Sequence, residues 1–289
     1  RTYNAAAQWL EKNHDADNFL LWVEGFDPHE PFDVPKEYMD LYEDDHFENS
    51  EQTYWPRYER SDGYTPEEIA HLRRRYKALL SMTDHYIGKL LDVLDQNDMW
   101  KVTTDHGFML GEHGFFAKCY MPDYNEVFHI PLMISMPGIK PGRCGALTQN
   151  IDMFPTFLEL FGVPESRCVN PIHGKSLLPL LRGEVEKLRE AVLYGVFGKT
   201  VNVTDGRYTY LKKPVTEDNQ PLTIYASVMA LLNKYIGLDS VKPEDFGKIR
   251  MGKGLSWTDY PVYEVPTEII DWGNYCLDFR ILHRFVEED

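Results

Sequence analysis

The most chemically capable residues of this chain are gathered in one short stretch, TTDHGFMLGEHGFFAK, at residues 103–118. Asp105 and His106 are adjacent there and offer a carboxylate oxygen and an imidazole nitrogen, a pair of ligands for a divalent cation that needs at least two more. Lys118 offers a positive point charge for an anion. His113 either supports the cation or the lysine, or is a hydrogen-bonded structural histidine. The stretch therefore indicates a site for a metal ion and an anion.

A second loop, DPHEPF at residues 27–32, presents one further histidine. His29 lies between two prolines, which stiffen the backbone and hold the imidazole in one direction. Histidine titrates near neutral pH and can give a proton to a leaving oxygen. Both loops follow apolar or β-prone residues, and ligands of open parallel sheets bind where the strands end. We therefore expect the two loops to serve one site.

The elements that must position these loops alternate between strands and helices. The apolar runs NFLLWVEGF (residues 18–26) and FHIPLMISMPG (residues 128–138) predict buried strands. TPEE at residues 65–68 combines an N-cap threonine, a proline at the first helical position and a glutamate, and predicts a long helix to about residue 97. IDMFPTFLELFGV and LLPLLRG predict short helices that end at glycines. This alternation predicts an α/β fold with a mainly parallel central sheet flanked by helices.

The last third of the chain has a different texture. AVLYGVF, KTVNVTDGRYTYLKK and YPVYEVP are rich in valine, threonine and tyrosine, and Asp205-Gly206 is a hairpin signal. PLTIYASVMALLNKYIGL, at residues 221–238, predicts a helix. We therefore expect an α/β catalytic domain, incomplete at its amino-terminal end, over residues 1–187. A smaller antiparallel α+β subdomain is expected over residues 188–289.

Composition limits the partners. The net charge of −16 argues against nucleic acid and against anionic membranes as partners of a basic face. An anionic substrate must therefore be drawn by a local positive site. No run of about 18 apolar residues is present, so the sequence predicts no membrane span. The chain opens on Arg1 without a signal-like segment, and the compartment and oligomeric state stay open.

These residues stand in a chain that resembles the sulfatases of the alkaline phosphatase superfamily, over about the carboxy-terminal three fifths of such an enzyme. The similarity runs through FLLWVEGFDPHEPFDVPKEYMDLY, RRRYKALLSMTDHYIGKLLDVL, TTDHGFMLGEHGFFAK, YNEVFHIPLMISMPG, QNIDMFPTFLELFGVP, HGKSLLPLLRG and VNVTDGRYTYL. The resemblance implies hydrolysis of a small-molecule or carbohydrate sulfate ester through a covalent sulfo-enzyme intermediate.

The resemblance also implies a role for each candidate residue. In such enzymes the acid of the TDHG motif and its neighbour bind one divalent cation, so Asp105 and His106 are the expected ligands, with His106 where many relatives have asparagine. Calcium is the expected ion, while the nitrogen ligand leaves manganese and zinc open. Lys118 corresponds to the lysine that binds the sulfate oxygens. His29 corresponds to the histidine that contacts the sulfate and helps the alcohol depart.

One departure from the family pattern is large. The family's nucleophile lies in a Cys/Ser-x-Pro-x-Arg motif, where it becomes a formylglycine, and the sequence contains no such motif. We therefore expect the nucleophile to lie outside these residues. Two alternatives stay open. One is a phosphonate monoester or phosphodiester hydrolase of the same superfamily, which shares the Asp-His-Gly loop, the lysine spacing and a Pro-His loop. The other is a non-catalytic, anion-binding pseudoenzyme.

Other polar and aromatic residues have ordinary interpretations. The family's early Asp-Asp metal-binding strand is absent, and Asp44 and Asp45 follow an aromatic loop, so we expect a solvated acidic pair. His71 and His85 fall inside the predicted long helix, where a surface or core role is favoured over metal ligation. The aromatic residues of QTYWPRYERSDGY, at residues 52–64, could stack on a sugar, but packing under the loop is favoured.

Overall fold

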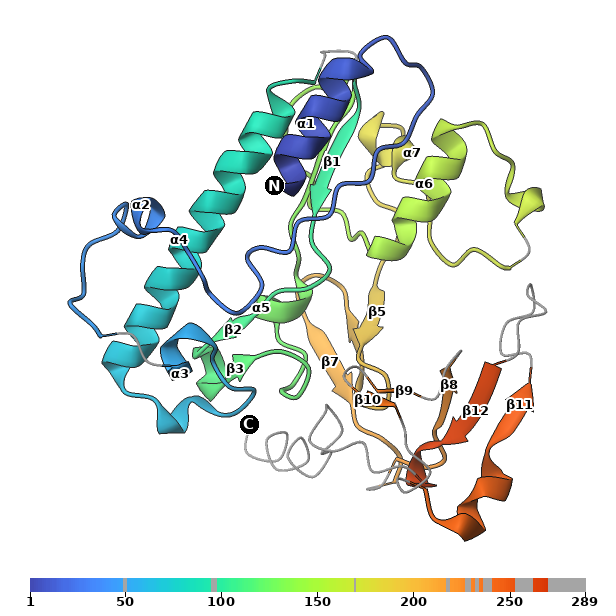
Figure 1. Ribbon diagram of the computed structural model, residues 1–289. Helices are drawn as coiled ribbons and strands as arrows, with labels where there is room; N and C mark the ends of the chain where they lie inside the picture. Colours follow the sequence, from blue (N-terminus) through green and yellow to red (C-terminus); the bar gives the residue numbers. More distant parts are fainter. Residues whose placement is uncertain are drawn as a thin grey trace. The chain divides into compact units, whose positions relative to one another are not determined.

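The computed structural model describes residues 1–48, 51–94, 98–168, 170–216, 219–226, 230–231, 234–235, 241–252 and 262–269. They form two compact units (Figure 1). The first comprises residues 1–118 and 124–140, and the second comprises residues 119–123 and the chain from residue 141 onward. The domain boundary after residue 187 stays a prediction. Within the described ranges, no helix has the length and apolar character that a membrane crossing requires.

The first unit is built mainly from helices, and the second mainly from strands. The elements of the first are α1 (Thr2–Lys12), α2 (Lys36–Met39), α3 (Glu51–Tyr54), α4 (Pro66–Leu91), β1 (Trp100–Thr103), β2 (Met109–Leu110), β3 (Phe116–Ala117), α5 (Asn125–Phe128) and β4 (Leu132–Ser135). The elements of the second are α6 (Met153–Leu160), α7 (Leu178–Leu181), β5 (Val192–Gly195), β6 (Val201–Thr204), β7 (Thr209–Lys212), β8 (Thr223–Ala226), β9 (Ala230–Leu231), β10 (Lys234–Tyr235), β11 (Arg250–Gly252) and β12 (Val262–Pro266).

Helix α4 is the long helix that the sequence predicts. Its N-cap is Thr65, whose hydroxyl accepts a hydrogen bond from the N–H of Glu68 at 3.2 Å. The Glu68 carboxylate in turn accepts from the N–H of Thr65 at 2.8 Å, which completes a capping box. Leu72 and Leu79 are fully buried, as their helical spacing indicates. The helix ends at Leu91, earlier than predicted.

The core of the first unit is assembled against α4. Phe32, Tyr64, Leu72, Leu79 and Phe116 form one buried cluster. Phe32 comes from the loop after α1 and Phe116 from β3, and neither has any exposed surface. Full burial of such a side chain contributes about 1.5–3 kcal/mol. Helix α1 packs along α4 as well (Figure 1).

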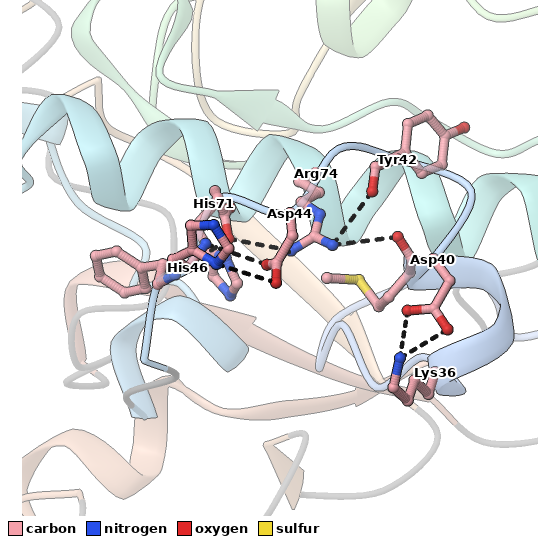
Figure 2. A network of polar contacts seen from close by, with 10 residues as sticks. Lys36, Asp40, Tyr42, Asp44, His46, His71 and Arg74 are labelled. Atoms are coloured by element: carbon pink, nitrogen blue, oxygen red, sulfur yellow. Dashed lines mark hydrogen bonds and ion pairs between the residues drawn. The ribbon is translucent and has the colours of Figure 1, made fainter.

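A polar network also holds the segment after α2 against α4 (Figure 2). Nη1 of Arg74 donates to Asp44 at 3.1 Å and to Asp45 at 3.0 Å. Nη2 donates to the main-chain carbonyls of Met39, at the end of α2, and of Tyr42. Asp45 also pairs with Nδ1 of His71 at 2.7 Å. His71 lies in the core, as favoured above. Asp44 and Asp45 are both exposed, as expected of a solvated pair, and α4 adds a guanidinium to both and an imidazole to Asp45.

The described strands pair antiparallel. β1 pairs with β4, from Trp100↔Ser135 to Thr103↔Leu132, and β2 pairs with β3. In the second unit, β5, β6 and β7 form one sheet and β11, β12 and β8 another. The predicted strand within residues 128–138 is confirmed as β4. The mainly parallel central sheet is not confirmed in the described part of the chain.

The strand predicted at residues 18–26 is absent. This segment is described throughout and has neither helical nor strand structure. The side chains of Leu20, Trp22 and Phe26 are 55%, 69% and 67% exposed. An apolar run indicates a tendency to burial, but a strand also needs a hydrogen-bonding neighbour, and no described strand pairs with this segment. The prediction is therefore wrong here.

The hairpin predicted at Asp205-Gly206 is confirmed between β6 and β7. Oδ1 of Asp205 accepts hydrogen bonds from two N–H groups of the turn, and Gly206 has a φ of +88°, which favours glycine. The helix predicted at residues 221–238 is wrong in its described part, which contains β8, β9 and β10. Pairing of β8 with β12 satisfies its backbone in a sheet and overrides the helical pattern.

The second unit contains a buried carboxylate, Asp152, at the start of α6. One oxygen accepts from Nη2 of Arg189 at 2.5 Å and from the N–H of Lys175 at 2.8 Å. The other accepts from Nη1 of Arg189 at 2.6 Å and from the N–H of Gln149 at 2.7 Å. Burial raises the pKa of Asp152, but these partners outweigh it, so the pKa lies below its ordinary value. The carboxylate thus ties three segments together.

We predict that Asp152→Asn lowers the free energy of unfolding by about 3–5 kcal/mol near neutral pH, because it leaves Arg189 buried without its counter-charge. Because the folded pKa is lowered, this stabilisation is present above the unfolded value near 3.8 and is lost as pH falls through the folded pKa. Urea unfolding at neutral pH and below the folded pKa measures both effects. Glu159→Gln, which breaks the half-exposed pair with Arg182, should cost at most about 1 kcal/mol. Equal losses in the two variants would contradict the assignment.

Candidate functional site

The loop that carries His29 is anchored at its last residue, Phe32. The N–H of Phe32 donates to the carbonyl of Tyr54 at 2.9 Å. Its carbonyl accepts two hydrogen bonds from the buried guanidinium of Arg75 in α4, at 2.9 Å from Nε and 2.6 Å from Nη2. A planar guanidinium that donates twice to one oxygen holds it in a defined direction. The loop therefore has little freedom close to His29.

Lys118 directly follows the short hairpin of β2 and β3. The register Met109↔Ala117 and the hydrogen bond from the N–H of Phe116 to the carbonyl of Glu59, at 3.1 Å, fix the end of this hairpin. The residues on either side of Lys118, Ala117 and Cys119, have φ values of +71° and +79°. Residues with side chains rarely adopt this left-handed region, and such strain is found mainly where the surrounding structure imposes it. The backbone at Lys118 is thus held in an unusual conformation.

The structure brings Lys118 and His29 together. Nζ of Lys118 lies 2.8 Å from Nε2 of His29 and 5.9 Å from the centre of the Phe108 ring. Nδ1 of His29 lies 2.5 Å from the carbonyl oxygen of Glu30. Because a carbonyl only accepts, this contact assigns the imidazole proton to Nδ1 and leaves Nε2 as an acceptor for the lysine. Lys118 is buried, whereas the His29 side chain is 37% exposed.

Glu30 is a member of this site that the sequence analysis missed. Its side chain is 2% exposed. One carboxylate oxygen accepts from the hydroxyl of Tyr58. The other, Oε2, lies 3.5 Å from Nζ of Lys118 and 3.3 Å from Nδ1 of His29. The sequence did offer a signal, an acidic residue directly between His29 and a proline. If such a carboxylate is buried, it requires a nearby cation or donor.

Asp105 and His106 present two adjacent donors. Nδ1 of His106 lies 2.9 Å from the carbonyl oxygen of Gly107, which leaves Nε2 for a ligand. This Nε2 lies 3.5 Å from Oδ2 of Asp105, a separation that one cation can bridge. Burial raises the pKa of Asp105, but His106 and the hydrogen bonds from Thr104 and the His106 N–H lower it by more, so the pKa lies below its ordinary value. The pair fits as part of a metal site, although no third acidic, histidine or cysteine ligand joins it among the described residues.

Gly107 holds this pair against α5. Its N–H donates to the carbonyl of Val127 at 2.8 Å. A Cβ at this position would lie 1.9 Å from the carbonyl oxygen of Glu126, so no side chain fits without movement of the backbone. Glycine is therefore required by a close approach of two main-chain segments.

His113 lies in the turn between β2 and β3 and contacts α5 and the residue before it. Its ring stacks on Tyr124, with centroids 4.0 Å apart and planes inclined by 13°. Its Nε2 lies 3.1 Å from the carboxylate of Glu126. These contacts fit the structural interpretation of His113. A supporting role for the metal or for Lys118 stays a prediction.

Comparison with known proteins shows the family. The family model described as Sulfatase matches residues 1–163, which is more than half of the chain and includes His29, Asp105, His106 and Lys118. The chain therefore belongs to the sulfatase family.

Among curated relatives, a choline-sulfatase of Rhizobium meliloti (strain 1021) is 30% identical over 228 residues, which cover 70% of this chain and 44% of the relative. An N-acetylglucosamine-6-O-sulfatase of Bacteroides thetaiotaomicron is 40% identical over 118 residues, which cover 38% of this chain and 20% of the relative. The matched part of this chain thus spans less than half the length of either relative.

Two solved structures show the same fold. A phosphonate monoester hydrolase of Agrobacterium radiobacter superposes with a TM-score of 0.54, at 22% identity over 73% of this chain and 51% of that one. A protein in complex with its substrate D-glucosamine-2-N,6-O-disulfate superposes with a TM-score of 0.56, at 19% identity over 74% of this chain and 61% of that one. At such identities the likeness concerns the fold alone. It confirms the α/β class of the prediction.

We predict that Gly107→Ala lowers the free energy of unfolding by about 1–3 kcal/mol or more, because the added methyl group forces two main-chain segments apart. Gly88→Ala is the matched control within α4, where a Cβ has nothing within 4 Å. It should raise the free energy of unfolding by about 0.5–1 kcal/mol, since alanine is the better helix former. Thermal unfolding of the two variants checks the signs, and a stable Gly107→Ala would show that the close approach is not required.

Proposed function

We propose that this chain carries part of the active site of a metal-dependent sulfatase, which hydrolyses sulfate esters with a formylglycine nucleophile that lies outside these residues. The observation that carries the proposal is the contact between Lys118 and His29, two residues 89 positions apart that meet in a chain of the sulfatase family. The names choline-sulfatase and N-acetylglucosamine-6-O-sulfatase of two relatives support a sulfate ester of a small molecule or a carbohydrate.

Lys118 and His29 can stabilise the negative charge that grows during this reaction on the outer ester oxygens and on the leaving oxygen. The buried ammonium of Lys118 can donate to the outer oxygens of the ester, where negative charge grows in the transition state. If the ammonium then turns from His29 to the ester, Nε2 of His29 can take up a proton from water, and the imidazolium can pass this proton to the leaving oxygen. The anchored backbone of both residues keeps the geometry ready before the substrate arrives.

Asp105 and His106 would hold the divalent cation with Oδ2 and Nε2. Calcium is the first expectation from the family, and the nitrogen ligand leaves manganese and zinc open. When bound, the cation supplies positive charge against the sulfate oxygens. The hydrogen bond from Nδ1 of His106 to the Gly107 carbonyl would leave Nε2 as the ring nitrogen available to such an ion.

Turnover of aryl sulfates and aryl phosphonates also tests the two alternative functions, a phosphonate hydrolase and a pseudoenzyme. The likeness to a phosphonate monoester hydrolase concerns the fold alone, so no feature of this chain favours phosphorus over sulfur. Turnover of aryl phosphonates but not of aryl sulfates by the full-length protein would select that alternative. Anion binding without turnover of either would select the pseudoenzyme.

We predict different kinetic losses for Lys118→Ala and His29→Ala in the full-length protein. Loss of the Lys118 charge should lower kcat/KM by roughly 10²-fold or more on every sulfate ester. Loss of His29 should slow an alkyl or sugar sulfate far more than a nitrophenyl sulfate, because a nitrophenolate leaves without a proton. Steady-state kinetics on the two esters measure the difference. Equal losses on both esters would make His29 a positioning residue and remove its role as the acid.

We predict that Asp105→Ala and His106→Ala each lower bound divalent metal and sulfate ester turnover together, because each removes one ligand. Asp84→Ala and His85→Ala are matched controls, since the same Thr-Asp-His sequence occurs there in α4. Elemental analysis after dialysis, with turnover of an aryl sulfate, measures both quantities. Wild-type metal content in both site variants would show that the ligands are elsewhere.

A further inference from the structure

The lysine assigned to the anion lies next to a fixed negative charge. Oε2 of Glu30 is 3.5 Å from Nζ of Lys118, and the two side chains are 2% and 8% exposed. Oε2 is buried and accepts no hydrogen bond from any residue of the described ranges. An acceptor left in this state is unfavourable unless a nearby charge compensates it. Lys118 is the cation that does so.

Glu30 cannot easily turn away from this position. Its other oxygen, Oε1, is held by the hydroxyl of Tyr58. Its backbone lies in the loop whose end, Phe32, is buried against α4 and tied to Arg75. The carboxylate therefore stays beside Lys118 when an anion binds. Any anion at Lys118 is attracted by the ammonium and repelled by this carboxylate.

On the basis of the proposed function, we propose that Glu30 determines the charge specificity of the site, favouring monoanionic esters over dianionic groups. A sulfate monoester carries one negative charge, whereas a phosphate monoester carries about two above its second pKa near 6. The repulsion from Glu30 grows with each added charge, and in buried surroundings it is only weakly screened. The carboxylate thus selects against phosphate monoesters.

The same repulsion acts on the product. Inorganic sulfate carries one more negative charge than the ester from which it is released. With Glu30 in place, the site binds the ester better relative to the free dianion than it would without this carboxylate. The residue would therefore also limit inhibition by the product.

The test compares two pairs of anions that differ by one charge, by isothermal titration of the full-length protein at about pH 8, where the phosphate monoester is a dianion. Methanesulfonate is paired with inorganic sulfate, and dimethyl phosphate with methyl phosphate. In Glu30→Gln, the affinity for the dianion relative to the monoanion should rise by about tenfold in both pairs. Glu30→Asp, which keeps the charge but withdraws it by one methylene, should show a smaller rise.

The ratio separates charge selection from a structural role. If Glu30 only held Lys118 in place, Glu30→Gln would lower both affinities by one factor and leave the ratio unchanged, which would overturn the proposal. A rise in Glu30→Asp as large as in Glu30→Gln would overturn it as well. If Glu30→Gln does not fold, a ratio in Glu30→Asp equal to that of the wild type would overturn the proposal. Asp84→Asn, which removes an exposed carboxylate from α4, should leave the ratio at the wild-type value.

The outcome for the proposed function is distinct. Equal affinity of these anions for the wild type and for Lys118→Ala would show that Lys118 does not form an anion site, and this would contradict both proposals. Anions that require Lys118 but show no change of ratio in Glu30→Gln would overturn only the role of Glu30.

Discussion

The burial of Phe32 and Phe116 against helix α4 is the constraint on which the candidate site depends. Phe32 follows His29 by three positions and Phe116 precedes Lys118 by two, so each site residue is attached to a core residue by a very short segment. Packing of the two rings on one helix therefore brings the two loops together. A core that loosened at either ring would separate Nζ of Lys118 from Nε2 of His29.

Electrostatics at this site is local. The chain as a whole carries a net charge of −16, which repels anions at long range. Lys118 is buried beside Glu30 and His29, so its charge is little screened by solvent for a group that contacts it, while the carboxylate of Glu30 offsets it at longer range. Lys118 thus offers an anion a local attraction that the acidic chain as a whole does not.

Prediction from sequence succeeded where short-range interactions decide the structure. The start of α4 follows from a capping box within four residues, and the β6–β7 hairpin follows from Asp205-Gly206. It failed where distant partners decide. The segment at residues 18–26 has the composition of a strand but pairs with no described strand, and β8 formed because β12 offered a ladder. Apolar content alone does not specify which backbone groups will pair.

The candidate site also has features that the local sequence indicates and features that only the tertiary structure determines. The types and spacing of Asp105, His106 and Lys118, with their likeness to the sulfatase pattern, were readable in the sequence, because they lie within one short loop region with glycines at the close approaches. The 2.8 Å contact between His29 and Lys118, and the place of Glu30 beside them, were decided only by tertiary structure. Whether side chains 88 or 89 positions apart meet depends on how their loops pack on α4, and the local sequence does not determine that distance.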